Sequence, residues 1–517
     1  MSAPQAAAAG TRSVLGIDIG AGSLKTTVVD DRGVERGSAT RDFPTHVPHP
    51  GWSEQDPEDW WRALCDTVPR ALAQAGLPAD SVKAVSFSAG AHSPVLTDAD
   101  GRLLRPAILW NDQRSGAEAR ELQAAHGARI LELALNRPVP TWTMPQLMWL
   151  VRHEPDVAAA TRHVYVAKDW LRMRLCGAWH TDVTDAVGTL LWDHGAACWS
   201  RELCDMIGWD VATLPPVVQP TDRVGAVTEA AARACGLPVG TPVVCGTSDT
   251  SAESYGAGSD RAGAGVVKLA TAGTISIVGD APRVHPTLIN YPFAIPGLWY
   301  TITGTNGCAS AHRWLRDRFF LREGESGAEV FAQMDAMAAQ VPVGSDGLLF
   351  HPYLQGERAP YWDPLLRADF VGMTMSHGRG HFVRALYEGI AFSLRDVLGE
   401  FRAQGLDMTE ARIVGGGARS ALWRQIVADV LGVRIVLPAV TDASFGAALL
   451  AGVAAGFFED ERAAARHGQG TRAVHEPDPQ AVARYTELFG LYKDAQAGLA
   501  AINHRLHAFA AATARTA

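Results

Sequence analysis

The sequence predicts an α/β fold made of two similar domains. A strand, a glycine-rich turn and a second strand are expected at 14–30, and the same pattern returns at 265–281. In both halves, strands are followed by segments in which apolar residues recur at helical spacing, such as 57–76 and 381–401. Strands mixed with helices in this order indicate a partly antiparallel sheet that helices cover.

The length supports two domains, because 517 residues exceed what a single core usually serves. The repeated hairpin places the boundary near 255–262, so we expect one domain at 13–257 and another at 258–495. Two similar domains that face each other create a central cleft, which is a natural place for a ligand.

The individual elements follow from local patterns in chain order. In the first half, strands are expected at 14–20, 25–31, 34–43, 82–90 and 106–112, and a helix begins near Asp56 or Pro57. In the second half, the repeated hairpin precedes the helix at 381–401 and a short strand at 411–417. Another helix is expected to begin near Ser420, shortly after three glycines.

The amino-acid composition makes some classes of binding partner unexpected. The net charge is −9 and acidic and basic residues are mixed along the chain, so nucleic acid is not an expected partner. Seven scattered cysteines without a CxxC pair indicate a reducing cytoplasm. The first residues lack the apolar segment of a signal peptide, and the longest apolar run, at 446–458, is too short to span a bilayer. We therefore expect a cytoplasmic protein without a membrane partner.

The first hairpin carries a buried acid beside a glycine turn. Asp18 lies between two isoleucines and is followed by Gly20, Gly22, Ser23 and Lys25. A buried carboxylate is costly unless it is paired or binds a metal, and the amides of a glycine turn can surround a phosphate. The pattern suits Mg²⁺ and a nucleoside triphosphate, although an ordinary hairpin whose aspartate caps a turn has the same spacing.

Two better-known nucleotide motifs do not fit this hairpin. The dinucleotide fingerprint needs a third glycine where this chain has Lys25, and its glycines lead into a helix rather than a strand. The P-loop needs Gly-Lys-Ser or Gly-Lys-Thr, which the hairpin lacks. The hairpin therefore indicates a different kind of phosphate site.

A second glycine cluster lies at Gly415, Gly416 and Gly417, between a strand and the helix expected at Ser420. Backbone amides and a helix N-terminus meet there, which suits a phosphate or an adenosine group. A tight strand-to-helix turn without a ligand is the alternative.

A third candidate is Asp249, which lies among small polar residues at 245–258. A positioned carboxylate can accept a proton from a substrate hydroxyl. The alternative is a helix cap, because the residues that follow Asp249 resemble the first turn of a helix.

Taken together and in order, these segments resemble one family. The stretches are GIDIGAGSLKTTVVDDRG, GWSEQDPEDWW, LRPAILWNDQRS, GTSDTSAESYGAG, PYLQGERAP and GGGARSALWRQIVADVLG. The chain resembles the FGGY carbohydrate kinases from about 13 to 495, and it is most similar to their xylulokinase branch. The resemblance implies two ribonuclease-H-like domains of the hexokinase/actin type that flank a central cleft.

The resemblance also implies roles for single residues. Asp18 matches the acid associated with Mg²⁺ and substrate, and Asp249 matches the catalytic base. Gly20, Gly22, Ser23 and Lys25 fall on the first phosphate hairpin. Thr271 and Gly273 match the second phosphate hairpin, and Gly415, Gly416, Gly417 and Ser420 match the adenosine-side motif. ATP and Mg²⁺ are the implied cofactors, and a homodimer is expected from the resemblance only.

The sugar pocket departs from the family pattern. The usual Gln-Met-His-Gly is replaced by Gly90, Ala91, His92 and Ser93, and the usual Asn after the catalytic acid is Thr250. His92 could bond a sugar hydroxyl, or it could be a packed histidine at a strand end. Trp110 matches the family's Trp-Asn-Asp and is expected either in the pocket wall or in the core. These changes bear on which hydroxyl is recognised.

The resulting hypothesis is ATP-dependent phosphorylation of a primary hydroxyl of D-xylulose, which gives D-xylulose 5-phosphate. Alternatives within the class are D-ribulose, L-ribulose, erythritol and threitol. Two alternatives from other classes are a sugar sensor without turnover and an actin-like ATPase that assembles into filaments. The intact Asp18 and Asp249 argue against the sensor, and the sugar-pocket motifs argue against the filament.

Overall fold

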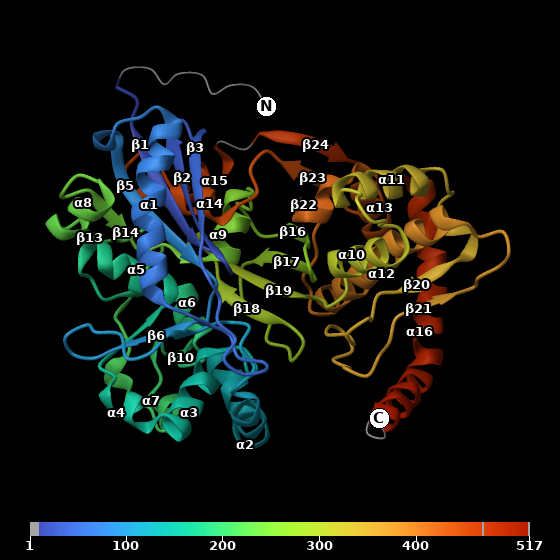
Figure 1. Ribbon diagram of the computed structural model, residues 1–517, viewed down its shortest axis with the longest axis horizontal. Helices are drawn as coiled ribbons and strands as arrows, with labels where there is room; N and C mark the ends of the chain where they lie inside the picture. Colours follow the sequence, from blue (N-terminus) through green and yellow to red (C-terminus); the bar gives the residue numbers. More distant parts are fainter. Residues whose placement is uncertain (1–9, 468–469, 515–517) are drawn as a thin grey trace. The chain divides into compact units, whose positions relative to one another are not determined.

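The computed structural model describes residues 10–467 and 470–514, which form two compact α/β units (Figure 1). The first nine residues, on which the expected lack of a signal peptide rests, lie outside the described residues. The first unit contains the described parts of 1–261, 280–300 and 440–469, and the second unit contains 262–279, 301–439 and 470–517.

The first unit is built on a mixed sheet in the order β13-β14-β5-β1-β2-β3, with β15 also paired to β5. The strands of this unit are β1 (Ser13–Ile19), β2 (Ser23–Asp30), β3 (Glu35–Asp42), β4 (Glu54–Gln55), β5 (Val82–Ala89), β6 (Pro94–Thr97), β7 (Ala107–Ile108), β8 (His163–Val166), β9 (Thr181–Asp182), β10 (Trp192–Asp193), β11 (Cys198–Trp199), β12 (Val217–Val218), β13 (Arg223–Ala226), β14 (Pro242–Val244), β15 (Thr247–Ser248) and β18 (Ile289–Pro292). Its helices are α1 (Pro57–Ala75), α2 (Gly116–Ala134), α3 (Thr143–His153), α4 (Pro155–Ala160), α5 (Ala167–Cys176), α6 (Val183–Gly188), α7 (Arg201–Ile207), α8 (Glu229–Cys235), α9 (Asp249–Gly256), α14 (Ala443–Ala454) and α15 (Glu461–Arg466).

Side chains alternate along β1, so that one face of the strand packs against α1 and the other lies against α14. Leu15, Ile17 and Ile19 are buried in one core cluster with the apolar side of α1. Since side chains alternate along a strand, Gly16 and Asp18 belong to the opposite face. A Cβ built on Gly16 would lie 1.8 Å from the carbonyl oxygen of Ser444, at the start of α14. The glycine therefore lets α14 approach the face of the sheet that also carries Asp18.

The second unit repeats the hairpin and the parallel strand beside it. The strands assigned to this unit follow one another in the order β19-β17-β16-β22-β23-β24, where β16 pairs antiparallel with β17 and parallel with β22. The elements of this unit are β16 (Ala264–Leu269), β17 (Gly273–Gly279), β19 (Trp299–Thr305), α10 (Ala309–Phe319), α11 (Gly327–Ala339), β20 (Leu349–His351), β21 (Asp369–Val371), α12 (Arg379–Ala403), β22 (Glu410–Val414), α13 (Ala421–Leu431), β23 (Arg434–Pro438), β24 (Thr471–His475) and α16 (Pro479–Ala514).

The α/β class, the two hairpins and the partly antiparallel sheets are confirmed. The helix expected near Asp56 is α1, which Asp56 caps by accepting a bond from the amide of Glu58, and the helix expected at Ser420 is α13. The domain division at 257/258 stays a prediction, while packing places α14 and α15, late in the sequence, in the first unit.

Within the described residues, we find no helix with the length and apolar character needed to cross a membrane.

The close approach at Gly16 gives a stability prediction. Gly16→Ala should lower the thermal midpoint of the first unit by about 5 °C or more, because the new methyl group collides with the backbone of α14. Gly399→Ala is the control, since Gly399 lies on the exposed side of α12 and its Cβ would meet nothing within 4 Å. That control should be neutral or slightly stabilising. Differential scanning calorimetry measures both, and equal midpoints for the two variants would contradict the prediction.

Candidate functional site

The candidate site of the first unit lies where neighbouring parallel strands end. β1 and β5 pair in parallel with Asp18 opposite Ser88, and β15 pairs in parallel with β5 so that Thr247 is also opposite Ser88. Asp249 follows β15 directly and begins α9. Ligands of α/β sheets usually bind beyond the carboxyl ends of such strands. Two acids that are 231 positions apart in the sequence therefore belong to one end of one sheet.

Asp18 stands in an unfavourable electrostatic environment. Its Oδ1 accepts a hydrogen bond of 2.7 Å from the hydroxyl of Ser88. Burial of the carboxyl and the negative charge of Asp249 raise its pKa to about 8, with smaller contributions from Asp442 and Glu253. The hydrogen bond from Ser88 lowers the pKa and only partly offsets these effects. The fold thus gathers negative charge around Asp18 and lacks an equal opposing charge there.

This excess of negative charge suits a divalent cation. In the described part of the chain, no group of three or more His, Cys, Asp or Glu side chains could hold a metal by itself. Mg²⁺ commonly uses only one or two carboxylates and takes its other ligands from water and substrate phosphates. Asp18, crowded by the charge of Asp249, fits that limited role, and its part in metal binding remains a proposal.

A small pocket of about 80 Å³ lies beside Asp249. The residues that line it are Ile19, Gly20, Ala21, Gln55, Trp60, Gly90, Ser93, Leu109, Trp110, Ala167 and Asp249. Trp110 is 46% exposed, so it lies in the pocket wall rather than in the core. A Cβ on Gly90 would lie 2.9 Å from Cδ1 of Trp110, so the missing side chain at Gly90 is what makes room for the indole.

His92 is held by the protein through both ring nitrogens. Its Nδ1 lies 2.5 Å from the carbonyl oxygen of Gly188, and its Nε2 lies 2.8 Å from the hydroxyl of Tyr291. Because burial lowers its pKa to about 4, the ring is neutral near pH 7. A neutral ring that donates from Nδ1 accepts the Tyr291 proton at Nε2. His92 also has a φ of 72°, which is unusual for a residue other than glycine. Binding a sugar through this ring would require one of these bonds to open.

The two other residues predicted for the sugar pocket flank these groups. The backbone N–H of Thr250 donates a 2.5 Å hydrogen bond to Oδ1 of Asp249, and the hydroxyl of Thr250 lies 3.1 Å from the same oxygen. The backbone N–H and the hydroxyl of Thr250 therefore both lie against the carboxylate of Asp249. Ala91 lies between Gly90 and His92 and is partly exposed.

The first glycine hairpin forms as expected, but its lysine, Lys25, is already paired with a carboxylate of the protein. Gly20 donates its N–H to the carbonyl of Ser23 at 2.9 Å, and Gly22 has open space on its Cβ side. Lys25 forms an ion pair with Asp442, the residue that caps α14. A phosphate at this turn would meet backbone amides first and would share Lys25 with Asp442.

The predicted nucleotide loops of the second unit lie side by side. The turn that contains Thr271 follows β16, and Gly415 follows its parallel neighbour β22. A Cβ on Gly415, which has a φ of 90°, would lie 2.6 Å from the carbonyl oxygen of Leu269. Gly416 faces open space, whereas Gly273 and Gly417 are buried in packing. Ser420 caps α13 by accepting a 3.0 Å bond from Trp423.

Sequence reasoning gave no role to several side chains around these groups. Gln55 donates to the carbonyl of Ala21 at 2.8 Å and accepts from the indole of Trp60 at 3.0 Å, so it fixes the hairpin tip. Ser88, Glu253, Asp442 and Tyr291 were not singled out either. Gln55 and Glu253 belong to the quoted stretches GWSEQDPEDWW and GTSDTSAESYGAG, whereas Asp442 and Tyr291 come from distant segments and carry no local signal.

With this geometry in view, the comparisons with known proteins identify the family. Models of the N-terminal and C-terminal domains of the FGGY family of carbohydrate kinases match residues 13–256 and 266–455. The chain belongs to this family. It is therefore a carbohydrate kinase, an enzyme that transfers phosphate to an alcohol group.

Relatives of this FGGY kinase extend over nearly its whole length. A xylulose kinase from Bacillus subtilis is 32% identical over 499 residues, which cover 96% of this chain and 99% of that protein. A gluconokinase from the same organism is 28% identical and covers 93% and 95% of the two chains. The solved structure of a xylulose kinase from Rhodospirillum rubrum is 30% identical, has a TM-score of 0.87, and covers 95% of this chain and 100% of that one.

The raised pKa of Asp18 predicts how stability depends on pH. In the folded protein this carboxyl stays protonated up to about pH 8, whereas in the unfolded chain it ionises with its ordinary pKa of 3.8. Between these two pH values the folded protein therefore binds more protons than the unfolded chain. Stability contributed by this proton is therefore lost as the pH rises from about 4 to about 8. Asp18→Asn removes the titrating proton, so the variant should lose less of its thermal midpoint between pH 6 and pH 8.5 than the parent loses.

Asp100→Asn is the control, because Asp100 is an exposed loop residue whose substitution should leave the parental pH dependence intact. Thermal midpoints without nucleotide or divalent cation, taken at both pH values, test the prediction. Identical shifts for Asp18→Asn and the parent would show that Asp18 ionises normally.

Proposed function

We propose that this kinase phosphorylates a primary hydroxyl of a ketopentose, with D-xylulose as its substrate and D-xylulose 5-phosphate as its product. The observation that carries the proposal is Asp249, a carboxylate at the start of α9 that lines a small pocket together with Trp110 and Gly90. A carboxylate within hydrogen-bond reach of a bound hydroxyl can act as a general base.

In the proposed mechanism, Asp249 accepts the proton of the sugar's primary hydroxyl. The hydroxyl oxygen attacks the γ-phosphorus of ATP, the bond from that phosphorus to the bridging oxygen breaks, and ADP leaves. Thr250 donates its N–H to Oδ1 of Asp249 and so fixes the direction of the carboxylate. Phosphoryl transfer depends mainly on positioning and charge, so this orientation is the main contribution of Asp249's neighbours.

Asp18 is the proposed holder of Mg²⁺. The ion would balance the charge of the phosphates, and it would also relieve the repulsion that raises the pKa of Asp18. The turn at Gly20–Ser23 is proposed to offer backbone amides to a phosphate of ATP, with Lys25 nearby. The loops at Thr271–Gly273 and Gly415–Ser420 are proposed to hold the remaining phosphates and the adenosine.

The lining of the pocket favours a neutral sugar. Its polar side chains are Gln55, Ser93 and Asp249, and no basic side chain belongs to it among the residues that the structure describes. Gluconate, the acid that the name of one relative suggests, would bring a carboxylate next to Asp249 without a cation to balance it. D-Ribulose, L-ribulose, erythritol and threitol are neutral and remain the alternatives, since Gly90 and Ala91 are smaller than the residues the xylulokinase pattern has there.

The decisive experiment is ADP release by the purified protein with MgATP and a panel of acceptors. The panel contains D-xylulose, L-xylulose, D-ribulose, L-ribulose, D-gluconate, glycerol, erythritol and D-threitol. We expect the highest kcat/KM with D-xylulose. Asp249→Ala should lower kcat by roughly 10³-fold and leave ATP affinity within about twofold, because it removes the base but not a nucleotide contact.

Asp100→Ala serves as the matched control, since it removes an exposed aspartate outside the pocket. A preference for another acceptor, with Asp249→Ala still inactive, would move the assignment to that acceptor. Full activity of Asp249→Ala would overturn the proposed base.

A further inference from the structure

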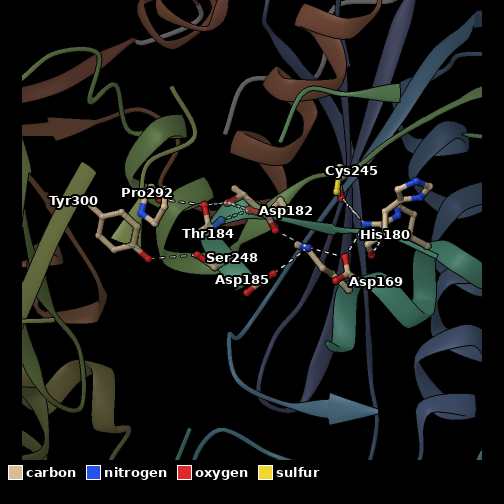
Figure 2. A network of polar contacts seen from close by, with 12 residues as sticks. Asp169, His180, Asp182, Thr184, Asp185, Cys245, Ser248, Pro292 and Tyr300 are labelled. Atoms are coloured by element: carbon tan, nitrogen blue, oxygen red, sulfur yellow. Dashed lines mark hydrogen bonds and ion pairs between the residues drawn. The ribbon is translucent and has the colours of Figure 1, made fainter. Parts of the chain in front are cut away.

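A cluster of buried charged side chains contacts the segment that leads to Asp249 (Figure 2). Lys168, near the start of α5, forms ion pairs with Asp169 at 2.6 Å, Asp182 at 2.8 Å and Asp185 at 2.9 Å. The side chains of all four residues are at most 2% exposed. Nothing in the proposed chemistry uses this cluster directly.

The cluster holds two cations and three carboxyl groups. Arg172 adds a second cation through a 2.6 Å ion pair with Asp169. Burial and the nearby carboxylates Asp182 and Asp169 raise the pKa of Asp185 well above its ordinary value, against the opposing effect of Lys168. The raised pKa of Asp185 favours its neutral form and so reduces the excess of carboxylates over cations in the cluster. Buried ion pairs add little net stability even when they balance, so a role in fixing geometry is the better explanation.

The segment that leads to Asp249 is attached to this cluster at two points. The guanidinium of Arg172 donates to the carbonyl of Cys245 at 3.0 Å. Two residues later, the hydroxyl of Thr247 reaches Oδ2 of Asp182 at 3.1 Å and Oγ1 of Thr184 at 3.0 Å. Only Ser248 separates this second attachment from Asp249.

The same cluster also fixes α6, the helix whose last residue, Gly188, contacts His92. Asp182 caps α6 by accepting a 3.0 Å hydrogen bond from the amide of Thr184, and the hydroxyl of Thr184 donates to the carbonyl of Pro292 at 3.0 Å. At the other end of α6, the carbonyl of Gly188 accepts the bond from His92. The cluster thus connects the segment before Asp249 and the helix that contacts His92 to one support.

We infer that the Lys168 cluster positions Asp249 for proton transfer, and that it acts through the hydroxyl of Thr247. Thr247 is a positioning residue, since it contacts the cluster and precedes the base without facing the pocket itself. The inference rests on the proposed role of Asp249 as the base. A displacement of about 1 Å at a reacting group can cost about 10²-fold in rate.

The test replaces Thr247 and leaves every ion pair of the cluster in place. Thr247→Val keeps the volume and removes the hydroxyl, whereas Thr247→Ser keeps the hydroxyl. Thr67→Val is the matched control, because Thr67 on α1 also has a buried hydroxyl, 2.7 Å from that of Thr26, but is remote from the pocket. Asp249→Asn is measured in parallel to test the base. Steady-state kinetics with the best acceptor of the panel gives kcat and both KM values, and calorimetry gives the thermal midpoints.

We expect Thr247→Val to lower kcat by about 10- to 100-fold with both KM values within about threefold, and Thr247→Ser to restore kcat to within about threefold of the parent. Thr67→Val should keep the parental kcat, even if its thermal midpoint falls as far as that of Thr247→Val. Parental kcat in Thr247→Val, with Asp249→Asn inactive, would overturn the positioning role alone. Parental activity in Asp249→Asn would overturn the proposed base and this inference with it.

Discussion

The repulsion among carboxylates at the end of β1 is the constraint on which the site of the first unit depends. Asp18 lies on the face of β1 that Gly16 opens to α14, and the approach of α14 brings Asp442 to Lys25. β15, on the far side of β5, delivers Asp249 to the same end of the sheet. The packing that stabilises the unit therefore also assembles the charge that raises the pKa of Asp18.

The first unit contains two groups of buried charged side chains, one around Lys168 and one around Asp18, and they differ in how their charges are paired. Around Lys168, two cations form ion pairs with three carboxyl groups, and hydrogen bonds extend from the cluster into β15 and α6. Around Asp18, burial and neighbouring carboxylates raise the pKa of the carboxyl, and the hydrogen bond from Ser88 offsets this effect only in part. This contrast supports the proposal that a ligand completes the environment of Asp18.

The sequence was sufficient to predict what is local. Both hairpins, the helix capped by Asp56 and the turn from Gly415 to Ser420 follow from turn chemistry and apolar spacing, and all of them formed. Asp18 and Asp249 were also singled out, because a carboxylate in a strand or among small residues is conspicuous, and their roles stay predictions.

Contacts between distant segments were not predictable in the same way. The pairing of Lys25 with Asp442 joins residues 417 positions apart, and the contact of His92 with Tyr291 spans 199 positions. Neither pair has a periodic or turn signal, so only the folded packing reveals that these side chains are already engaged. The Lys168 cluster left a weaker trace, since a lysine at the start of an otherwise buried helix is uncommon and could have been questioned.

The most direct test measures the pKa of the Asp18 carboxyl by ¹³C NMR in protein with labelled aspartate. The signal of Asp18 is assigned by its loss in the Asp18→Asn variant. The account predicts a pKa near 8 without ligand. With Mg²⁺ and nucleotide bound, it predicts a lower pKa, because a cation favours the ionised form. A pKa near the ordinary value of about 4 in the free protein, unchanged by Mg²⁺ and nucleotide, would contradict the proposal that burial and neighbouring carboxylates raise the pKa of Asp18 and that a cation binds there.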